Sequence, residues 1–264
     1  MKEFIERNEW ALILGGSSGL GLATAKKLAQ HGLNICIVHR NLRLQQEAIA
    51  KEFETIKQEG VQFKSFNVDA FKPDIRNQVI DELKVLFGKT HKIKALVHSV
   101  AKGNLKPMVS EESIELKHDD FVLTIQAMGI SLYDWFKSVF NTRLFSKDAR
   151  IISFTSEGNS KALQNYAAVS TAKVTLEAIT RNIALEFAPH GVKANCIQAG
   201  VTDTASLRLI PGSDKIIEQS EKRNPNKRLT TPEDVANAVY LLIKDEASWI
   251  TGAIIPVDGG EHLR

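Results

Sequence analysis

Short, continuously apolar segments alternate with helical patterns along almost the whole chain. Seven of these segments have the length of strands, at residues 10–14, 34–38, 62–66, 95–98, 150–155, 192–198 and 253–257. The helical patterns cover residues 22–30, 42–59, 74–87, 121–139, 166–187 and 232–243. Strands that lack polar alternation are buried on both faces, so this order predicts an α/β fold: a doubly wound, seven-stranded parallel sheet with helices on both faces. Pro256 has no N–H to donate, which places the last strand at a sheet edge.

Length and charge limit the classes of protein to which the chain can belong. With 264 residues, 43% of them hydrophobic, the chain can bury one substantial core, and no Pro/Gly/Ser-rich linker divides it. We therefore predict a single domain, residues 1–264. A net charge of +3, without a basic run interleaved with aromatic residues, argues against nucleic-acid binding.

Cysteine use and hydropathy predict a reducing, aqueous compartment. Cys36 and Cys196 lie in apolar runs without metal-ligand spacing, so we expect buried free thiols and no metal site. No apolar stretch reaches membrane-spanning length, and residues 1–7 lack the apolar core of a secretory signal. These features predict a soluble cytoplasmic protein.

A glycine-rich turn links the first predicted strand to the first predicted helix, with the sequence Gly15-Gly16-Ser17-Ser18-Gly19-Leu20-Gly21. Glycines remove side chains that would block a close ligand, and backbone N–H groups at a helix N-terminus attract a pyrophosphate. The spacing, Gly-x3-Gly-x-Gly, differs from the G-x-G-x-x-G of other dinucleotide folds. The turn is therefore a candidate dinucleotide site, and a tight turn that binds nothing is the alternative.

Tyr166 and Lys173 lie seven residues apart in a segment that reads as one helix. Seven residues are about two helical turns, so both side chains are expected on nearly the same face. An ammonium beside a phenol stabilises phenolate and lowers the tyrosine pKa, which suits protonation of a carbonyl oxygen near neutral pH. Taken alone, such a pair also arises by chance on an ordinary helix.

Several further motifs occur in the order found in the short-chain dehydrogenase/reductase superfamily, which the chain resembles from Trp10 to Gly260. The glycine turn is followed by Asn67-Val68, His98-Ser99, Ser156, and Tyr166 with Lys173. Residues 199–204 are similar to the family's Pro-Gly-x-x-x-Thr. The resemblance implies an NAD(P)H-dependent oxidoreductase with Tyr166, Lys173 and Ser156 as catalytic residues. It implies cofactor contacts from Gly15, Ser17, Ser18, Gly19, Leu20, Gly21, Arg40, Asn67, Val68, Ser99, Lys173, Gly200, Thr202 and Thr204.

The position of the tyrosine departs from the common family pattern. Most members carry tyrosine four residues before the lysine, where this chain has Val169, which has no proton to give. The spacing of Tyr166 and Lys173 resembles that of the enoyl-acyl-carrier-protein reductases, and residues 163–166, 176–181 and 202–205 are most similar to their NADPH-dependent, FabL-like branch. A shift of three residues moves a side chain about 4.5 Å along a helix. In an enoyl thioester the charged oxygen lies further from the hydride-accepting carbon than in a ketone, so a displaced acid suits it.

The end of the second predicted strand bears on the choice of cofactor. An acidic residue there would bind the ribose 2′-hydroxyl of NAD, but the chain reads Val38-His39-Arg40. The planar guanidinium of Arg40 suits a 2′-phosphate, to which Ser18 could add a hydroxyl. We therefore predict NADPH, with an ordinary surface arginine as the alternative.

Three further side chains are candidates with open roles. Ser156 either donates to the substrate oxygen or orders the site, and it is one of several hydroxyls between Thr155 and Ser160. Gln126 takes the position where many relatives carry an asparagine that helps hold the lysine and a water, which puts that proton relay in doubt. His98 is predicted to be a strand-end residue bonded to backbone rather than a catalytic base.

The segment 202–229 is long and mixes apolar and basic residues, so we predict a substrate lid whose apolar side chains cover an acyl chain. A helix packed permanently on the core is the alternative. An acidic acyl carrier protein could dock beside this segment on Arg208, Lys215, Lys222, Arg223, Lys227 and Arg228. The same charges could equally serve only to solvate a surface helix.

Together these features predict an NADPH-dependent enoyl-thioester reductase of fatty-acid synthesis. Its substrate would be an enoyl thioester, and the family resemblance implies a homotetramer. A carbonyl or 3-ketoacyl reductase with an unusual acid is the second hypothesis. A cofactor-binding protein without catalysis is the third, and it depends on the departures at Val169 and Gln126.

Overall fold

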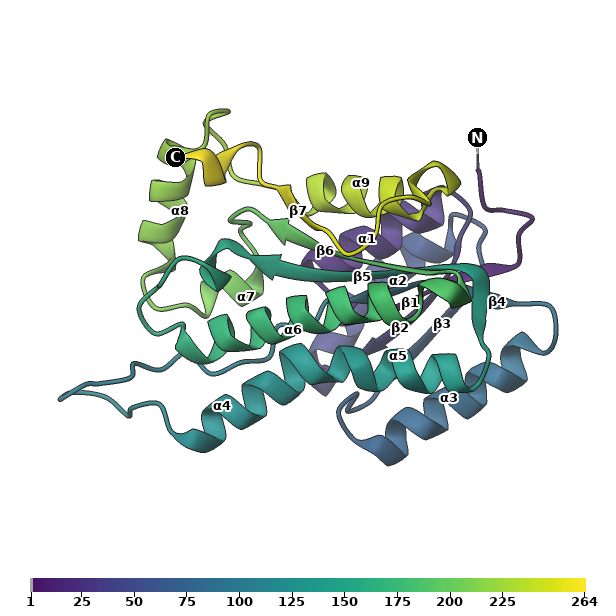
Figure 1. The fold of residues 1–264 in the computed structure, drawn as a ribbon, viewed down its shortest axis with the longest axis horizontal. Coiled ribbons are helices and arrows are strands. Elements are labelled where there is room, and N and C mark those ends of the chain that lie inside the picture. The colour runs from purple at the N-terminus through teal and green to yellow at the C-terminus, as the bar shows by residue number, and fades with distance from the viewer. Residues whose placement is uncertain (1) are drawn as a thin grey trace.

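The computed structural model describes residues 2–264 and contains one seven-stranded sheet whose strands are all parallel (Figure 1). Met1, the first residue of the N-terminal stretch considered above, lies outside the described residues. The strand order is β3-β2-β1-β4-β5-β6-β7. The strands are β1 (Glu9–Leu14), β2 (Asn34–His39), β3 (Phe63–Asn67), β4 (Lys92–His98), β5 (Phe145–Ser156), β6 (Val192–Ala199) and β7 (Ile254–Val257). The predicted fold class is confirmed, and β7, which contains Pro256, lies at an edge.

Helices cover both faces of the sheet, as the apolar strands require. One face carries α1 (Gly19–Gln30), α2 (Gln46–Lys57) and α9 (Pro232–Ile243). The other carries α3 (Pro73–Phe87), α5 (Ser131–Asn141) and α6 (Ala167–Glu186). The sequence signal at the start of α9 is confirmed, because the Thr231 hydroxyl accepts from the Asp234 N–H at 3.2 Å with Pro232 in the first turn.

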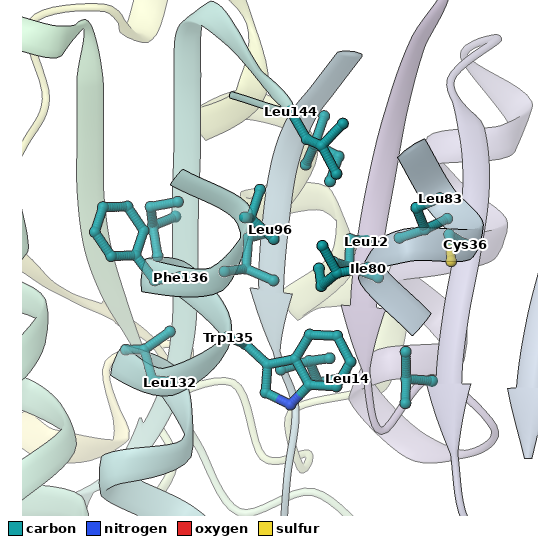
Figure 2. Close-up of a cluster of buried hydrophobic side chains, with 14 of the residues drawn as sticks. Leu12, Leu14, Cys36, Ile80, Leu83, Leu96, Leu132, Trp135, Phe136 and Leu144 are labelled. Atoms are coloured by element: carbon teal, nitrogen blue, oxygen red, sulfur yellow. The ribbon is translucent and has the colours of Figure 1, made fainter. Parts of the chain in front are cut away.

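The two hydrophobic cores fix the sheet between these layers. Figure 2 shows the core beneath α3 and α5, where Trp135 lies close to Leu14 of the central strand β1. Trp135 is fully buried, and its indole N–H donates to the carbonyl oxygen of Ala70 at 2.9 Å, so burial leaves no polar group of this ring unpaired. Cys36 lies in the same core and Cys196 in β6; both are buried and free, as predicted.

The segments 121–139 and 202–229 differ from the sequence prediction, whereas 99–117 lies where no helix or strand is predicted. The helix expected over 121–139 is α4 (His118–Ile125), a π-helical turn (Gln126–Ile130) and α5 in succession. Residues 99–117 form neither helix nor strand and reach outward from the body (Figure 1). The segment 202–229 contains α7 (Ala205–Arg208) and α8 (Ser213–Arg223), which carry few apolar residues with the spacing that makes a helix recognisable.

In residues 2–264, no helix is both long and apolar enough to cross a membrane. The same residues include no group of three or more His, Cys, Asp or Glu side chains placed to hold a metal ion.

Candidate active site

The glycine turn lies at the carboxyl end of β1, in the middle of the sheet, where parallel α/β folds place their ligands. Gly15 has φ +81°, and a Cβ atom there would lie 2.1 Å from the Ser99 carbonyl oxygen. A Cβ on Gly21 would lie 2.4 Å from the Gly15 carbonyl oxygen. Both positions therefore require glycine. At these glycines the backbone of the turn packs directly against the backbone that follows β4 and against the first turn of α1.

The first turn of α1 is free to receive an anion. Ser18 is its N-cap residue, yet its side chain makes no capping hydrogen bond, and the first turn contains no acidic residue. Ser17 precedes it in the turn, and Leu20 packs into the core beneath α1. The unpaired N–H groups of a helix start carry a partial positive charge that favours a phosphate.

The chain after β6 closes the other side of this turn. Thr204 caps α7 by accepting from the Leu207 N–H at 3.3 Å, and its methyl group would lie 3.5 Å from a Cβ on Gly19. Thr202 is buried and donates to the Gly200 carbonyl oxygen at 3.0 Å. The structure thus brings the glycine turn and the chain after β6 together at the carboxyl ends of the strands.

Arg40 directly follows β2, and Asn67 ends the neighbouring strand β3. The Asn67 side chain accepts from the Asn41 N–H at 2.9 Å and donates to the Asn41 carbonyl oxygen at 3.1 Å, which fixes the backbone next to Arg40. Val68 follows, with its N–H on the His39 carbonyl oxygen at 2.8 Å.

Sequence reasoning missed Asp69, which forms an ion pair with Arg40 at 2.7 Å. The sequence predicts no acid near Arg40, and this prediction is wrong. Asp69 is 29 residues away in the sequence but follows β3, the strand next to β2. The register that pairs His39 with Asn67 brings the two strand ends together. The signal that could have identified Asp69 is its position directly after Asn67-Val68, at the end of β3.

Tyr166 and Ser156 meet at the end of β5. The two hydroxyl oxygens are 3.3 Å apart, and the Tyr166 ring lies so close to Gly158 that a Cβ there would lie 2.6 Å from Cε1. Tyr166 is the N-cap residue of α6, with φ −111° and ψ 2°, and the helix begins at Ala167. The predicted helix therefore starts one residue too early, although the Tyr166 carbonyl oxygen accepts from the Ser170 N–H at 2.8 Å and so begins the hydrogen-bond ladder of α6.

The environment of Tyr166 is apolar. The ring packs against a cluster of Ala127, Met128, Val169 and Ala172. Burial raises the pKa of Tyr166, while the hydrogen bond with Ser156 opposes the rise. The expectation that a neighbouring ammonium lowers this pKa is not met, and Tyr166 stays a protonated donor at neutral pH.

Lys173 is buried beneath this site and donates from Nζ to the Phe154 carbonyl oxygen at 2.6 Å. Burial lowers the pKa of Lys173 to about 8, against the opposing influence of Cys196 and Glu177. One of its three N–H donors is used by β5, so two are available to a ligand.

His98 and Gln126 point to other partners. Burial, together with the Lys173 ammonium, lowers the pKa of His98 to about 3, so its ring is neutral. Its Nε2 lies 2.8 Å from the Ser131 hydroxyl, a side-chain partner rather than the backbone partner expected. The Gln126 amide donates to Asp134 at 3.2 Å and so does not serve the lysine.

The segment 202–229 is tied to the site by Arg223. This residue, at the end of α8, forms ion pairs with Glu157, which directly follows Ser156, at 2.7 Å, and with Glu261 near the C-terminus at 2.5 Å. Other basic residues proposed to dock a carrier protein are also paired within the chain: Arg208 with Asp203 and Asp214, Lys222 with Glu218, and Arg228 with Asp234.

A comparison of the sequence with known families decides the affiliation. The profile of the family described as "Enoyl-(Acyl carrier protein) reductase" matches residues 15–262, which include every motif of the site. The chain is a short-chain dehydrogenase/reductase. It is therefore an NAD(P)H-dependent oxidoreductase, as its motifs predicted.

Individual relatives of this dehydrogenase/reductase have different activities. It is 29% identical to a 7alpha-hydroxysteroid dehydrogenase of Paraclostridium sordellii, over 97% of the chain and 92% of the relative. It is 28% identical to the enoyl-[acyl-carrier-protein] reductase [NADH] FabI of Enterococcus faecalis, over 97% of the chain and 98% of the relative. Among solved structures, FabI of Candidatus Liberibacter asiaticus superimposes with a TM-score of 0.84 at 21% identity, covering 98% of this chain and 97% of that one. The last likeness concerns the fold alone.

The residues of this dehydrogenase/reductase fit a dinucleotide cofactor. Three features lie at the carboxyl ends of the strands: the glycines where a Cβ would clash, the uncapped and acid-free start of α1, and the exposed guanidinium of Arg40. These groups suit a pyrophosphate and the adenosine end of a dinucleotide.

Proposed function

We propose that this enzyme reduces the carbon–carbon double bond of trans-2-enoyl thioesters in fatty-acid synthesis, using NADPH. One observation carries the proposal: the hydroxyl that meets Ser156 belongs to Tyr166, while Val169, four residues before Lys173, is buried in the apolar cluster. The acid is therefore displaced from the position that serves ketones in most of the family. The family profile and the FabI relative support the same substrate class.

The chain's own residues supply the proton side of the reaction. Tyr166, kept protonated by burial, donates to the thioester oxygen on which negative charge develops. Ser156 donates to the Tyr166 oxygen in turn and so stabilises the charge passed to the phenol. The bound nicotinamide cofactor supplies the hydride. Lys173, anchored on the Phe154 carbonyl, keeps two donors for the nicotinamide ribose.

The cofactor proposal places the pyrophosphate at the start of α1 and the 2′-phosphate at Arg40 and Ser18. Arg40 is 64% exposed, so its guanidinium can turn from Asp69 to a bound phosphate at low cost. Ser99, Gly200, Thr202 and Thr204 contact the rest of the cofactor in this proposal. Because a carboxylate lies beside Arg40, the preference for NADPH depends on the phosphate competing successfully with Asp69.

The segment 202–229 serves in this proposal as the substrate lid of a single domain. Its helices α7 and α8 lie next to the site, and Arg223 joins α8 to the residue after Ser156. The thioester is delivered by acyl carrier protein or by coenzyme A.

We also infer a cytoplasmic homotetramer. A groove of about 400 Å³ between α5 and α6 has a mainly apolar lining, which includes Val174 and Ile179 and which a second copy would cover. Trp249, 96% exposed near the edge strand β7, marks a second apolar surface. Sedimentation velocity on the protein and on Val174→Lys tests the assembly, with a shift to smaller species expected in the variant.

The test of function compares crotonyl and acetoacetyl thioesters at one NADPH concentration. We expect turnover of the crotonyl compound and little of the acetoacetyl compound. Faster turnover of acetoacetyl thioester would establish the second candidate, a 3-ketoacyl reductase. The 7alpha-hydroxysteroid dehydrogenase relative is the observation that favours this alternative.

A further inference from the structure

A buried carboxylate that the proposed reaction does not use lies next to the proton-delivery site. Glu177 is 6% exposed and follows Lys173 by four residues on α6, so both side chains lie on one face of the helix. An isolated buried carboxylate is costly, which means that this one must be held by donors.

The donors come from the segment that carries Ser156. The Thr155 hydroxyl donates to Glu177 Oε1 at 2.5 Å, and the Asn159 amide donates to the same oxygen. Thr155 directly precedes Ser156, and Asn159 ends the short 3₁₀ turn Glu157–Asn159. Glu177 thus joins α6, which carries Lys173, to both sides of the serine that meets Tyr166. Two donors on one carboxylate oxygen are an arrangement that suits a negative charge.

The charges around the Lys173 amine give Glu177 a second effect. The titratable groups that act on this amine are His98 on β4, Cys196 on β6 and Glu177 on α6, with Arg181 further along α6 near Cys196. His98 is neutral, and burial raises the pKa of the Cys196 thiol to about 11, so the thiol is neutral too. Glu177 is the carboxylate among these groups, and its effect on the Lys173 amine opposes that of burial.

We propose that Glu177 is a positioning residue: it anchors the end of β5 around Ser156 and holds Lys173 in its charged form. The inference rests on the proposed roles of Tyr166 and Lys173. Glu177 itself touches neither substrate nor cofactor in this scheme.

The charge effect is tested by titrating the Lys173 amine in the cofactor-free protein by NMR with ¹³C,¹⁵N-lysine, the signal being assigned from its loss in Lys173→Met. Glu177→Gln retains the Oε1 acceptor and removes the charge, so we expect the Lys173 midpoint to fall by roughly one pH unit or more. Glu177→Asp keeps the charge and should leave the midpoint near that of the wild-type protein. An equal midpoint in the wild type and Glu177→Gln would overturn the charge effect.

The anchoring effect is tested separately through Thr155. Thr155→Val removes the hydroxyl and keeps the shape, so we expect a several-fold loss of kcat, little change in KM and no change in the Lys173 midpoint, with recovery in Thr155→Ser. Thr180→Val is the matched control, because Thr180 is a buried threonine of α6 bonded to Ser153. A kcat of Thr155→Val equal to that of Thr180→Val would overturn the anchoring role.

A measurement on the wild-type protein covers the case in which Glu177→Gln does not fold. The ¹³C carboxyl signal of Glu177 must be that of a deprotonated carboxylate at pH 7, and a protonated group would overturn the inference. These titrations need no substrate. Failure to reduce enoyl thioesters would therefore count against the proposed function alone, whereas an unchanged Lys173 midpoint in an active enzyme would count against Glu177 alone.

Discussion

The two ends of the candidate site hold their charges in opposite ways. At the proton-delivery end, Lys173 is 8% exposed and bonded to the backbone of β5, and Tyr166 packs in an apolar cluster. At the cofactor-selecting end, the Arg40 side chain is 64% exposed and forms an ion pair with the carboxylate of Asp69. Burial fixes protonation and makes each group expensive to alter, whereas exposure lets a ligand exchange one ion pair for another at low cost. Substitutions should therefore have large effects at the first end and graded effects at the second.

The largest effect is expected from Tyr166→Phe, which removes the acid and keeps the ring on Gly158. We expect kcat to fall by about 100- to 10,000-fold, the range for loss of a positioned acid, with little change in the KM for NADPH. Steady-state assays with crotonyl thioester measure both constants.

Ser156→Ala is the companion variant and should lose less, because Ser156 acts on the substrate through Tyr166. A Tyr166→Phe enzyme that kept most of its kcat would show that the buried end does not supply the proton.

The second prediction concerns the free energy of unfolding and Lys173. Its folded-state pKa, about 8, lies below the ordinary value of 10.5. Below pH 8 both the folded and unfolded chains carry this proton, and the full cost of burying the charge is present, on the order of 3 kcal/mol. Between the two values the unfolded chain binds more protons, so stability rises with pH.

Lys173→Met should therefore be more stable than the wild type at pH 7, and the difference should shrink between pH 8 and 10.5. Urea unfolding of both proteins across this range measures it, and subtraction cancels groups that titrate alike in both. Lys51→Met, at an exposed position on α2, is the control and should show no such pH dependence. If the difference in the free energy of unfolding between Lys173→Met and the wild type does not change with pH, burial does not destabilise the charged form of Lys173.

At the exposed end, Arg40→Ala should weaken NADPH binding by roughly 10- to 100-fold, because a hydrogen bond to a charged group is worth about 1.5 to 3 kcal/mol. NADH binding should hardly change. Asp69→Asn should tighten NADPH by up to about fivefold, since it frees Arg40 from an exposed ion pair. Fluorescence titration with both cofactors tests these expectations, and equal losses for NADPH and NADH in Arg40→Ala would make Arg40 a structural residue.

The two ends also differ in how far sequence could predict them. Apolar strands, the glycine turn and the Thr231-Pro232 cap are local patterns, so the fold and the order of the site segments followed from them. Asp69 contacts Arg40 at the end of the neighbouring strand, and Glu177 contacts residues around the end of β5. Such contacts between elements distant in sequence form only when the chain is folded, so no local pattern indicates them. The helix predicted over 166–187 begins one residue before α6, because the apolar periodicity does not distinguish the N-cap residue Tyr166 from the first residue of the helix.

The smallest effect is expected where carrier-linked substrate would dock, and it extends the comparison to the lid. Four of the six basic side chains proposed for docking already pair with acids of the same chain, which leaves Lys215 and Lys227 as the unpaired cations of this set in residues 2–264. Salt weakens the attraction between exposed charges, with a Debye length of about 10 Å at 0.1 M.

We therefore expect the KM for carrier-linked crotonyl substrate to rise only about two- to fivefold between low and moderate salt, as two exposed charges allow. The KM for the coenzyme A thioester should rise less. Lys215→Glu should raise the carrier-linked KM by a similar few-fold and leave the coenzyme A value unchanged, with Lys51→Glu, remote on α2, as the matched control. A steep salt dependence confined to the carrier-linked substrate would show that Arg208, Lys222, Arg223 and Arg228 exchange their internal partners on docking. The lid would then resemble the exposed cofactor end, where a ligand replaces an ion pair, rather than the buried end.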